Sequence, residues 1–371
     1  MPASPLPAPA YVRAIAPYQA GKPIEELARE YGLDPATIVK LASNENPLGM
    51  PASAQRAVSA ALGELGRYPD SNGFDLKRAL GARFDVPPDW LTLGNGSNDI
   101  LELAAGALLG PGASCVYAQY AFAVYALATQ ARGARSIVVP AERFGHDLDA
   151  MRAAIDAETR LIYIANPNNP TGTFLQATRL LAFLEQVPRD VVVVLDEAYN
   201  EYLPVTLQYD SVAWVRRLPN LLVSRTFSKA FGLAGLRVGY GIAQPELTDL
   251  LNRVRHPFNV NQAAQAAAVA ALADVEFLAH SAQLNRAGMA ALTAGFERLG
   301  LAHVPSVANF VLVQVGAGAR VYEALLRRGV IVRPTANYGL PQWLRITIGL
   351  PEENARLLQV LPEALAAAAR G

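Results

Sequence analysis

Short apolar runs alternate with stretches of helical periodicity from about residue 53 to residue 258. The clearest run, residues 191–195, is four valines followed by a leucine. An unbroken apolar run of this length is typical of a parallel strand that is buried on both faces. Further candidate strands are residues 91–93, 114–117, 136–139, 161–165, 221–224 and 237–243. The alternation predicts an α/β fold with a mostly parallel sheet covered by helices.

The last two candidate strands, 221–224 and 237–243, lie close together in the chain. A parallel pair needs a crossover connection of a dozen or more residues that usually holds a helix. We therefore expect the second of these strands to run antiparallel to the first.

The pattern changes after residue 261. An alanine-rich helix is expected over residues 262–273 and a second helix over about 276–299, because alanine favours helix. Short strands follow at 310–315, 330–332 and 343–348, with a helix between the first two and a closing helix at 352–369. We expect three parts: residues 1–45 as an N-terminal arm and a segment that packs on the small domain, 46–261 as a large α/β domain, and 262–371 as a small α+β domain.

Lys229 stands just past one of the apolar runs, with hydroxyls at Thr226 and Ser228 and a guanidinium at Arg237. Lysine becomes a useful nucleophile when it forms a Schiff base with an aldehyde, most often that of pyridoxal 5'-phosphate. Hydroxyls and a guanidinium are the groups that a cofactor phosphate needs beside that lysine. Taken alone, the segment is better explained by a solvated lysine in a glycine-rich loop, which is what such a lysine usually is.

Asp196 ends the run at residues 191–195, where open α/β sheets place their ligands. A carboxylate there would keep the pyridine nitrogen of the cofactor protonated, so that the ring accepts electrons. Tyr199 would donate its phenol to the 3'-oxygen of the ring. The alternatives are an aspartate that caps the next element and a tyrosine that only packs.

Two turns add candidate contacts. The Asn- and Pro-rich segment 166–172 is a tight turn that presents Asn169, whose amide would reach the same 3'-oxygen. After residues 91–93, a glycine-rich turn leads into a helix that begins at Ser97 or Asn98. Free backbone N–H groups at a helix start form an anion site that suits a phosphate, although a helix cap without a ligand has the same residues.

In this order and spacing, the segments resemble the aspartate aminotransferase superfamily, the fold type I pyridoxal-phosphate enzymes, over essentially the whole chain. Within it the chain is most similar to the histidinol-phosphate aminotransferases. This second resemblance is carried by residues 16–22, 40–49, 67–70, the turn at 168–172, the strand end at 196–199, the lysine segment 226–239 and residues 344–349. The fold implied is a large domain with a mostly parallel seven-stranded sheet plus a smaller α+β domain.

The resemblance implies a role for each cofactor-binding position. Lys229 would form the Schiff base and move the proton, Asp196 would pair with the ring nitrogen, and Tyr199 and Asn169 would contact the 3'-oxygen. Tyr120 would stack on the ring. The phosphate would be held by Gly96, Ser97, Asn98, Thr226, Ser228 and Arg237, and by Tyr68 from the partner of a homodimer. Relatives usually have an acidic residue where Asn98 stands, so only its backbone N–H carries over.

The resemblance also implies substrate contacts. Arg345 would grip the substrate α-carboxylate through two parallel hydrogen bonds, a task that lysine performs poorly, and Asn169 would lie beside it. Arg333 and Tyr18 would lie at the far end of the substrate, near the phosphate of histidinol phosphate. The implied reaction is transamination of L-histidinol phosphate with 2-oxoglutarate, giving imidazole acetol phosphate and glutamate.

Other activities remain on the same scaffold, namely aromatic amino acid aminotransferase and phosphothreonine-type decarboxylase. A regulator that pairs this fold with a DNA-binding module is disfavoured. About 45 residues precede the cofactor-binding pattern, without a basic helix-turn-helix.

Composition is consistent with a small-molecule enzyme. Lys+Arg and Asp+Glu both number 32, so no net positive charge favours nucleic acid or an anionic membrane. The longest apolar run, 263–279, is interrupted by polar and acidic residues, which argues against a membrane span. Cys115 is the one cysteine and lies in an apolar stretch, so we expect a buried thiol, no internal disulfide and no metal site. Nothing in residues 1–10 resembles an export signal; we expect a flexible arm there and a cytoplasmic protein.

Overall fold

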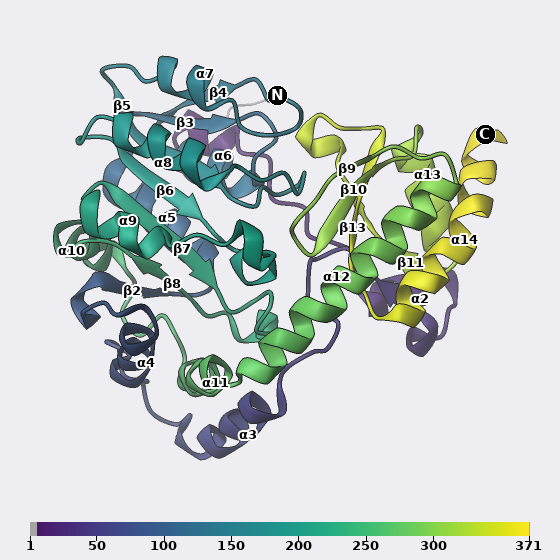
Figure 1. The fold of residues 1–371 in the computed structure, drawn as a ribbon, viewed down its shortest axis with the longest axis horizontal. Helices are drawn as coiled ribbons and strands as arrows, with labels where there is room; N and C mark the ends of the chain where they lie inside the picture. Colours follow the sequence, from purple (N-terminus) through teal and green to yellow (C-terminus); the bar gives the residue numbers. More distant parts are fainter. Residues whose placement is uncertain (1–5, 371) are drawn as a thin grey trace.

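The computed structural model describes residues 6–370 and places them in two lobes that the helix α12 (Val275–Arg298) connects (Figure 1). The larger lobe holds a seven-stranded sheet in the order β2-β8-β7-β6-β5-β3-β4. Its strands are β2 (Leu91–Gly94), β3 (Ser114–Ala118), β4 (Arg135–Val139), β5 (Thr159–Ala165), β6 (Val192–Asp196), β7 (Leu221–Thr226) and β8 (Gly239–Ile242). β8 is antiparallel to both neighbours and the other pairs are parallel. The expected sheet and its antiparallel strand are confirmed.

Helices cover both faces of this sheet because its strands are apolar on both sides. Leu161 and Tyr163 of β5 lie in one core and Ile162 and Ile164 in the other, as the two-residue period of a strand requires. The first core contains side chains of α5 (Ser97–Leu108), α6 (Ala123–Ala131) and α10 (Pro245–Val254). The second contains side chains of α3 (Ala52–Ala61), α4 (Phe74–Phe84), α7 (Leu148–Ala153), α8 (Ala177–Gln186), α9 (Ser211–Arg217) and α11 (Gln262–Ala273).

The smaller lobe is built on a four-stranded antiparallel sheet, β12-β13-β10-β9. Its strands are β9 (His303–Val304), β10 (Phe310–Gln314), β12 (Arg333–Pro334) and β13 (Trp343–Thr347), and its helices are α12, α13 (Gly318–Leu326) and α14 (Pro351–Arg370). The strand expected over residues 330–332 is wrong in extent. The chain changes sheets at Val332: β11 (Val330–Ile331) pairs with β1 (Val39–Lys40), and β12 pairs with β13.

The N-terminal segment lies on this smaller lobe. β1 runs parallel to β11, and Leu27 of α2 (Ile24–Tyr31) and Ile38 are buried against Leu326 and Ile331. Of the arm expected over residues 1–10, the first five residues lie outside the described part of the chain. A short helix α1 (Ala10–Arg13) follows, and the Tyr11 carbonyl accepts a hydrogen bond from Gln130 of α6.

The small domain was expected to start at residue 262. The hydrophobic core to which each helix contributes its side chains indicates where the boundary lies. Ala264, Ala267, Ala268 and Ala271 of α11 lie in the core beneath the seven-stranded sheet. Phe296, near the end of α12, lies instead in the core of the smaller lobe. We therefore propose that the boundary falls within α12, which leaves α11 with the large domain.

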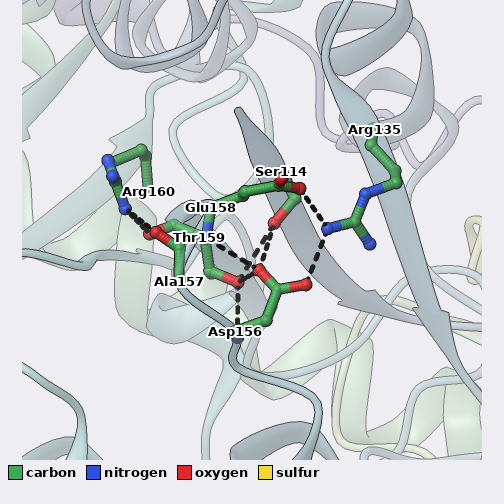
Figure 2. Close-up of polar contacts among 7 residues, drawn as sticks. All are labelled: Ser114, Arg135, Asp156, Ala157, Glu158, Thr159 and Arg160. Atoms are coloured by element: carbon green, nitrogen blue, oxygen red, sulfur yellow. Dashed lines mark hydrogen bonds and ion pairs between the residues drawn. The ribbon is translucent and has the colours of Figure 1, made fainter. Parts of the chain in front are cut away.

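The edge of the large sheet that lies away from the strands' carboxyl ends is tied by a polar cluster (Figure 2). Arg135 at the start of β4 donates to Asp156 at 2.6 Å and to Glu158 at 2.8 Å. Asp156 also accepts from Ser114 and Thr159, which begin β3 and β5. The Arg135 guanidinium holds the pKa of the Asp156 carboxyl well below its usual range. These contacts link the starts of β3, β4 and β5. They lie at the opposite edge from the carboxyl ends of the strands.

Two further expectations concern the interior and the membrane. Cys115 is buried, and this burial raises the pKa of its thiol to about 12. Between residues 6 and 370, no helix combines the length and the apolar character that crossing a bilayer requires.

Candidate active site

A cavity of about 460 Å³ opens at the carboxyl ends of β5, β6 and β7. Most side chains that the sequence predicted for the site line it, although they come from both lobes. These are Tyr18, Ser97, Asn98, Asn169, Asp196, Tyr199, Thr226, Ser228, Lys229, Arg237, Arg333 and Arg345. The sequence therefore predicted a set of residues that the fold brings together.

Lys229 lies in this cavity, three residues after β7 ends at Thr226. Its Nζ donates a hydrogen bond of 3.0 Å to the Ser43 carbonyl oxygen. Burial, together with the positive charges of Arg345 and Arg237, lowers the pKa of the ammonium to about 8. A lysine with this pKa is in part neutral near pH 7, which is what a nucleophilic amine requires.

Asp196 is the last residue of β6 and is buried. Its Oδ2 accepts a 2.8 Å hydrogen bond from the Tyr125 hydroxyl, whereas its Oδ1 has no partner within the described residues. Burial raises the pKa of this carboxyl to about 6, and the Tyr125 hydrogen bond opposes the rise. A buried carboxylate oxygen without a donor is costly, so this atom fits a ligand that brings a protonated nitrogen.

A phosphate-sized cradle lies between the start of α5 and Arg237. Arg237 Nη1 donates to Ser228 Oγ at 3.1 Å and Nη2 to the Asn95 carbonyl at 3.2 Å. Gly96 has φ 80°, and a Cβ at this position would lie 2.6 Å from Arg237 Nη2. The backbone N–H groups at the N-terminus of α5 and the Thr226 and Ser228 hydroxyls complete a set of donors that suits a phosphate.

Arg345, in β13 of the smaller lobe, is a buried guanidinium with partners from other parts of the fold. Its Nη1 donates to Asn169 Oδ1 at 2.6 Å and its Nη2 to the Ala42 carbonyl at 2.8 Å. Its Nε is buried and lacks a partner across residues 6–370. Burial lowers the pKa of this group. The unsatisfied N–H suits an anionic ligand such as a carboxylate.

Tyr199 lies in the same cavity as Asn169 and Asp196. Its hydroxyl accepts a 2.9 Å hydrogen bond from Asn44 Nδ2 and remains able to donate. Burial raises the pKa of this phenol, so it keeps its proton at neutral pH. A protonated phenol in this place fits an acceptor oxygen on a ring.

Arg333 and Tyr18 form one end of the cavity. The Arg333 guanidinium carbon lies 5.6 Å from the Tyr18 ring centroid, and Nη2 donates to the Gln19 carbonyl at 2.7 Å. Arg333 is buried, while Tyr18 is half exposed. Arg333 therefore lines the same cavity as Arg345 and Arg237.

Two aromatic side chains that were predicted to contact the cofactor do not line the cavity. Tyr120 lies against Phe144, with ring centroids 5.9 Å apart, in a small cluster with Leu312 and Trp343. From this part of the chain, the aromatic residue that lines the cavity is Phe122. Stacking by Tyr120 is therefore a wrong prediction, because the loop after β3 turns the ring of Tyr120 toward the smaller lobe.

Tyr68 also lies outside the cavity of its own chain. It is 82% exposed and stacks on Phe258, with ring centroids 4.6 Å apart. This placement is the one expected of a side chain that serves another copy of the chain, which stays a prediction.

Sequence reasoning missed four contributors to the site: Ser43, Asn44, Phe122 and Tyr125. Ser43 and Asn44 stand in the segment 40–49 that carried the family resemblance, so that segment could have been searched for contacts. Tyr125 contacts Asp196 from a helix 71 residues away in the chain, and no local pattern marks it.

Comparison with known proteins identifies a family. The model of the family described as aminotransferase class I and II matches residues 36–361. Histidinol-phosphate aminotransferase 1 of Cupriavidus pinatubonensis is 71% identical over 361 residues, which cover 96% of each chain. Histidinol-phosphate aminotransferase of Methylobacillus flagellatus is 60% identical over 358 residues, which cover 96% of this chain and 97% of the relative.

A solved structure is similar over the whole fold. Histidinol-phosphate aminotransferase from Sinorhizobium meliloti in complex with pyridoxal-5'-phosphate has a TM-score of 0.87 and 28% sequence identity, and the match covers 98% of this chain and 99% of that one. The fold type I architecture expected from the sequence is thus confirmed.

Proposed function

Because this chain belongs to the class I and II aminotransferases, we propose that its cavity exchanges an amino group between L-histidinol phosphate and 2-oxoglutarate, giving imidazole acetol phosphate and glutamate. This is a step of histidine biosynthesis. The observation that carries the proposal is that Lys229, Asp196 and two guanidiniums, Arg345 and Arg333, line one cavity.

The cofactor is pyridoxal phosphate, as in the Sinorhizobium meliloti relative. When bound, it supplies an aldehyde that takes up the substrate amine and a ring that accepts electrons from the substrate carbon. The orphaned Oδ1 of Asp196 fits the protonated ring nitrogen. The cradle of Gly96, Ser97, Asn98, Thr226, Ser228 and Arg237 fits the phosphate.

The remaining residues position the substrate and move its proton. Lys229, with its lowered pKa, has an amine that can accept the proton from the substrate carbon bearing the amino group and return it nearby. Tyr199 and Asn169 line the cavity and would contact the 3'-oxygen of the ring. Phe122, in place of Tyr120, supplies an aromatic face to the cavity.

Two guanidiniums suit both substrates of the exchange. Glutamate carries two carboxylates. In the half-reaction that uses glutamate, Arg345 can bind one of them and Arg333 the other. Histidinol phosphate carries a phosphate and no carboxylate, so in the other half the guanidiniums face a dianion. This arrangement favours phosphate selectivity over an aromatic amino acid aminotransferase.

We also propose a homodimer in the cytoplasm. Tyr68, Phe74 and Phe258 are exposed aromatic side chains, and exposed apolar surface of this kind is typical of an interface. In such a dimer Tyr68 would reach the cofactor phosphate of the partner. A reducing compartment would keep the lone Cys115 as a thiol.

A coupled assay tests the function. Histidinol phosphate with 2-oxoglutarate is compared with phenylalanine and tyrosine as amino donors, and phosphothreonine is tested for release of carbon dioxide. We expect kcat/KM for histidinol phosphate to exceed that for either aromatic amino acid by about 100-fold, since a phosphate site left empty binds poorly. Equal or inverted preference would support the aromatic aminotransferase, and carbon dioxide release the decarboxylase.

A further inference from the structure

Tyr125 is a buried tyrosine in α6 that no sequence pattern assigned to the site. Its ring is stacked on Tyr163, with centroids 4.4 Å apart and planes 3° from parallel. Phe122 meets it edge-on at 6.0 Å, and Tyr117 lies at 6.5 Å. The side chain is 0% exposed. The ring therefore has one position, and its hydroxyl points in one direction.

That direction is toward Asp196. The hydroxyl donates to Asp196 Oδ2 at 2.8 Å, while Oδ1 has no donor among residues 6–370. The two carboxylate oxygens are thus divided between a protein donor and a free atom. A hydrogen bond on one oxygen fixes the rotation of the carboxylate about its bond to the β-carbon, which in turn fixes where the free oxygen points.

We propose that Tyr125 is a positioning residue for Asp196: its hydroxyl holds Oδ2 so that Oδ1 faces the ring nitrogen of the cofactor. This inference rests on the proposed role of Asp196. Tyr125 itself does not line the cavity, so it acts on the cofactor only through the carboxylate.

The surrounding charges are consistent with this role. Burial and the charge of Glu197 favour the protonated form of Asp196, whereas the Tyr125 hydrogen bond, the Ala198 backbone N–H and the charge of Lys229 favour the carboxylate. The ionisable groups that face Asp196 are Tyr125, Glu197, Lys229 and Tyr199, with Tyr163 behind Tyr125. Glu197 is itself paired with Arg225 at 2.8 Å. Burial raises the pKa of Tyr125 well above its usual value, so the phenol stays a donor at any working pH.

The test uses apoenzyme and two ligands: pyridoxal phosphate and its analogue with C–H in place of the ring nitrogen. The ratio of their dissociation constants reports the contact between Oδ1 and the ring nitrogen. We expect Tyr125→Phe to reduce the preference for pyridoxal phosphate by roughly tenfold, as befits a hydrogen bond to a charged group. Asp196→Asn should reduce it at least as much.

Tyr163→Phe is the matched control. It removes a hydroxyl from the neighbouring buried ring, but that hydroxyl donates to the Leu101 carbonyl at 2.7 Å and not to Asp196. We expect it to leave the ratio of dissociation constants unchanged. A structural effect of losing a buried hydroxyl would alter both Tyr variants alike, and this outcome would overturn the proposal.

The outcomes separate the inference from the function beneath it. If Asp196→Asn keeps the wild-type ratio of dissociation constants, Asp196 does not contact the ring nitrogen. The proposed role of Asp196 and the inference about Tyr125 then both fail. If Asp196→Asn loses the preference while Tyr125→Phe keeps it, only the role of Tyr125 fails.

A second variant covers misfolding of Tyr125→Phe. The double variant Tyr125→Phe/Asp196→Asn buries no lone carboxylate, so it should be more thermally stable than Tyr125→Phe if the hydroxyl serves that carboxylate. Equal instability of the two would show that the tyrosine only packs, and would overturn the proposal.

Discussion

Arg345 and Asn169 join the two lobes through a 2.6 Å hydrogen bond from Nη1 to Oδ1. Arg345 belongs to β13 of the small sheet, and Asn169 to the turn after β5 of the large one. Both side chains are buried and line the cavity. The guanidinium that we assign to the substrate anion is therefore oriented by a residue that we assign to the cofactor.

Arg345→Lys should lower kcat/KM for glutamate by about 100-fold. A lysine has a single charged nitrogen and cannot serve Asn169, the Ala42 carbonyl and a carboxylate together. Steady-state kinetics with glutamate and imidazole acetol phosphate measure this. Arg327→Lys, at an exposed arginine of α13's C-terminus, is the control and should change little. Near-normal kinetics for Arg345→Lys would exclude bidentate binding there.

The lowered pKa of Lys229 predicts how the apoenzyme captures its cofactor with pH. Only the neutral amine attacks an aldehyde. Because burial and nearby arginines lower the pKa of this group to about 8, the capture rate should rise by about tenfold per pH unit below that value and level off above it. Stopped-flow absorbance from pH 6.5 to 9.5 measures the rate. A rise that continues without levelling to pH 9.5 would contradict the lowered pKa.

Arg333 should carry the preference for phosphorylated substrates. Replacement by glutamine removes the positive charge from the Tyr18 end of the cavity. We expect kcat/KM for histidinol phosphate to fall by about 100-fold and that for phenylalanine by far less, since a phosphate loses a charge-assisted contact that phenylalanine never makes. A uniform loss for both substrates would indicate that Arg333 supports the fold rather than selectivity.

Mixed dimers test whether Tyr68 acts across an interface. Tyr68→Ala and Lys229→Ala should each be weakly active or inactive alone. When the two are unfolded and refolded together, a hybrid dimer has one site with both changes and one site with neither. Random pairing then restores roughly a quarter of wild-type activity. If the mixture shows only the mean of its parents, Tyr68 serves its own subunit or no site.

His146 should make stability sensitive to acid. It is buried, and desolvation lowers the pKa of its imidazole from 6.5 to about 4. The unfolded chain takes up a proton below pH 6.5, whereas the folded chain resists until about pH 4. The free energy of unfolding should thus fall by up to about 3 kcal/mol across that window.

Denaturant unfolding at pH 7 and pH 4.5 checks the effect of His146. His146→Gln should flatten the difference between the two pH values, and His280→Gln, at an exposed histidine, should not. If His146→Gln keeps the full acid sensitivity, other groups account for it.

The sequence predicted the sheet and the residues at its strand ends well, for a physical reason. Asp196 and Lys229 each follow an apolar run, and parallel strands bring their carboxyl ends to one edge. Local pattern and spacing were enough to place both groups in one site.

The geometry of loops and the contacts between distant residues could not be predicted from the local sequence pattern. Tyr120, Phe122 and Tyr125 lie within six residues, in the loop after β3 and the first turn of α6, where no periodicity decides which ring faces the cavity. Asn44 contacts Tyr199 and Thr347, which lie 155 and 303 residues further along the chain. Such partners depend on how the lobes meet.

Residues 42–44, near the beginning of the chain, form hydrogen bonds with the side chains assigned to catalysis. The carbonyl oxygens of Ala42 and Ser43 accept hydrogen bonds from Arg345 and Lys229. The side-chain amide of Asn44 donates one to the Tyr199 hydroxyl. Just before them, β1 is fastened to β11 of the smaller lobe. A movement of the smaller lobe would therefore also move residues 42–44, and with them the hydrogen-bond partners of Lys229, Arg345 and Tyr199.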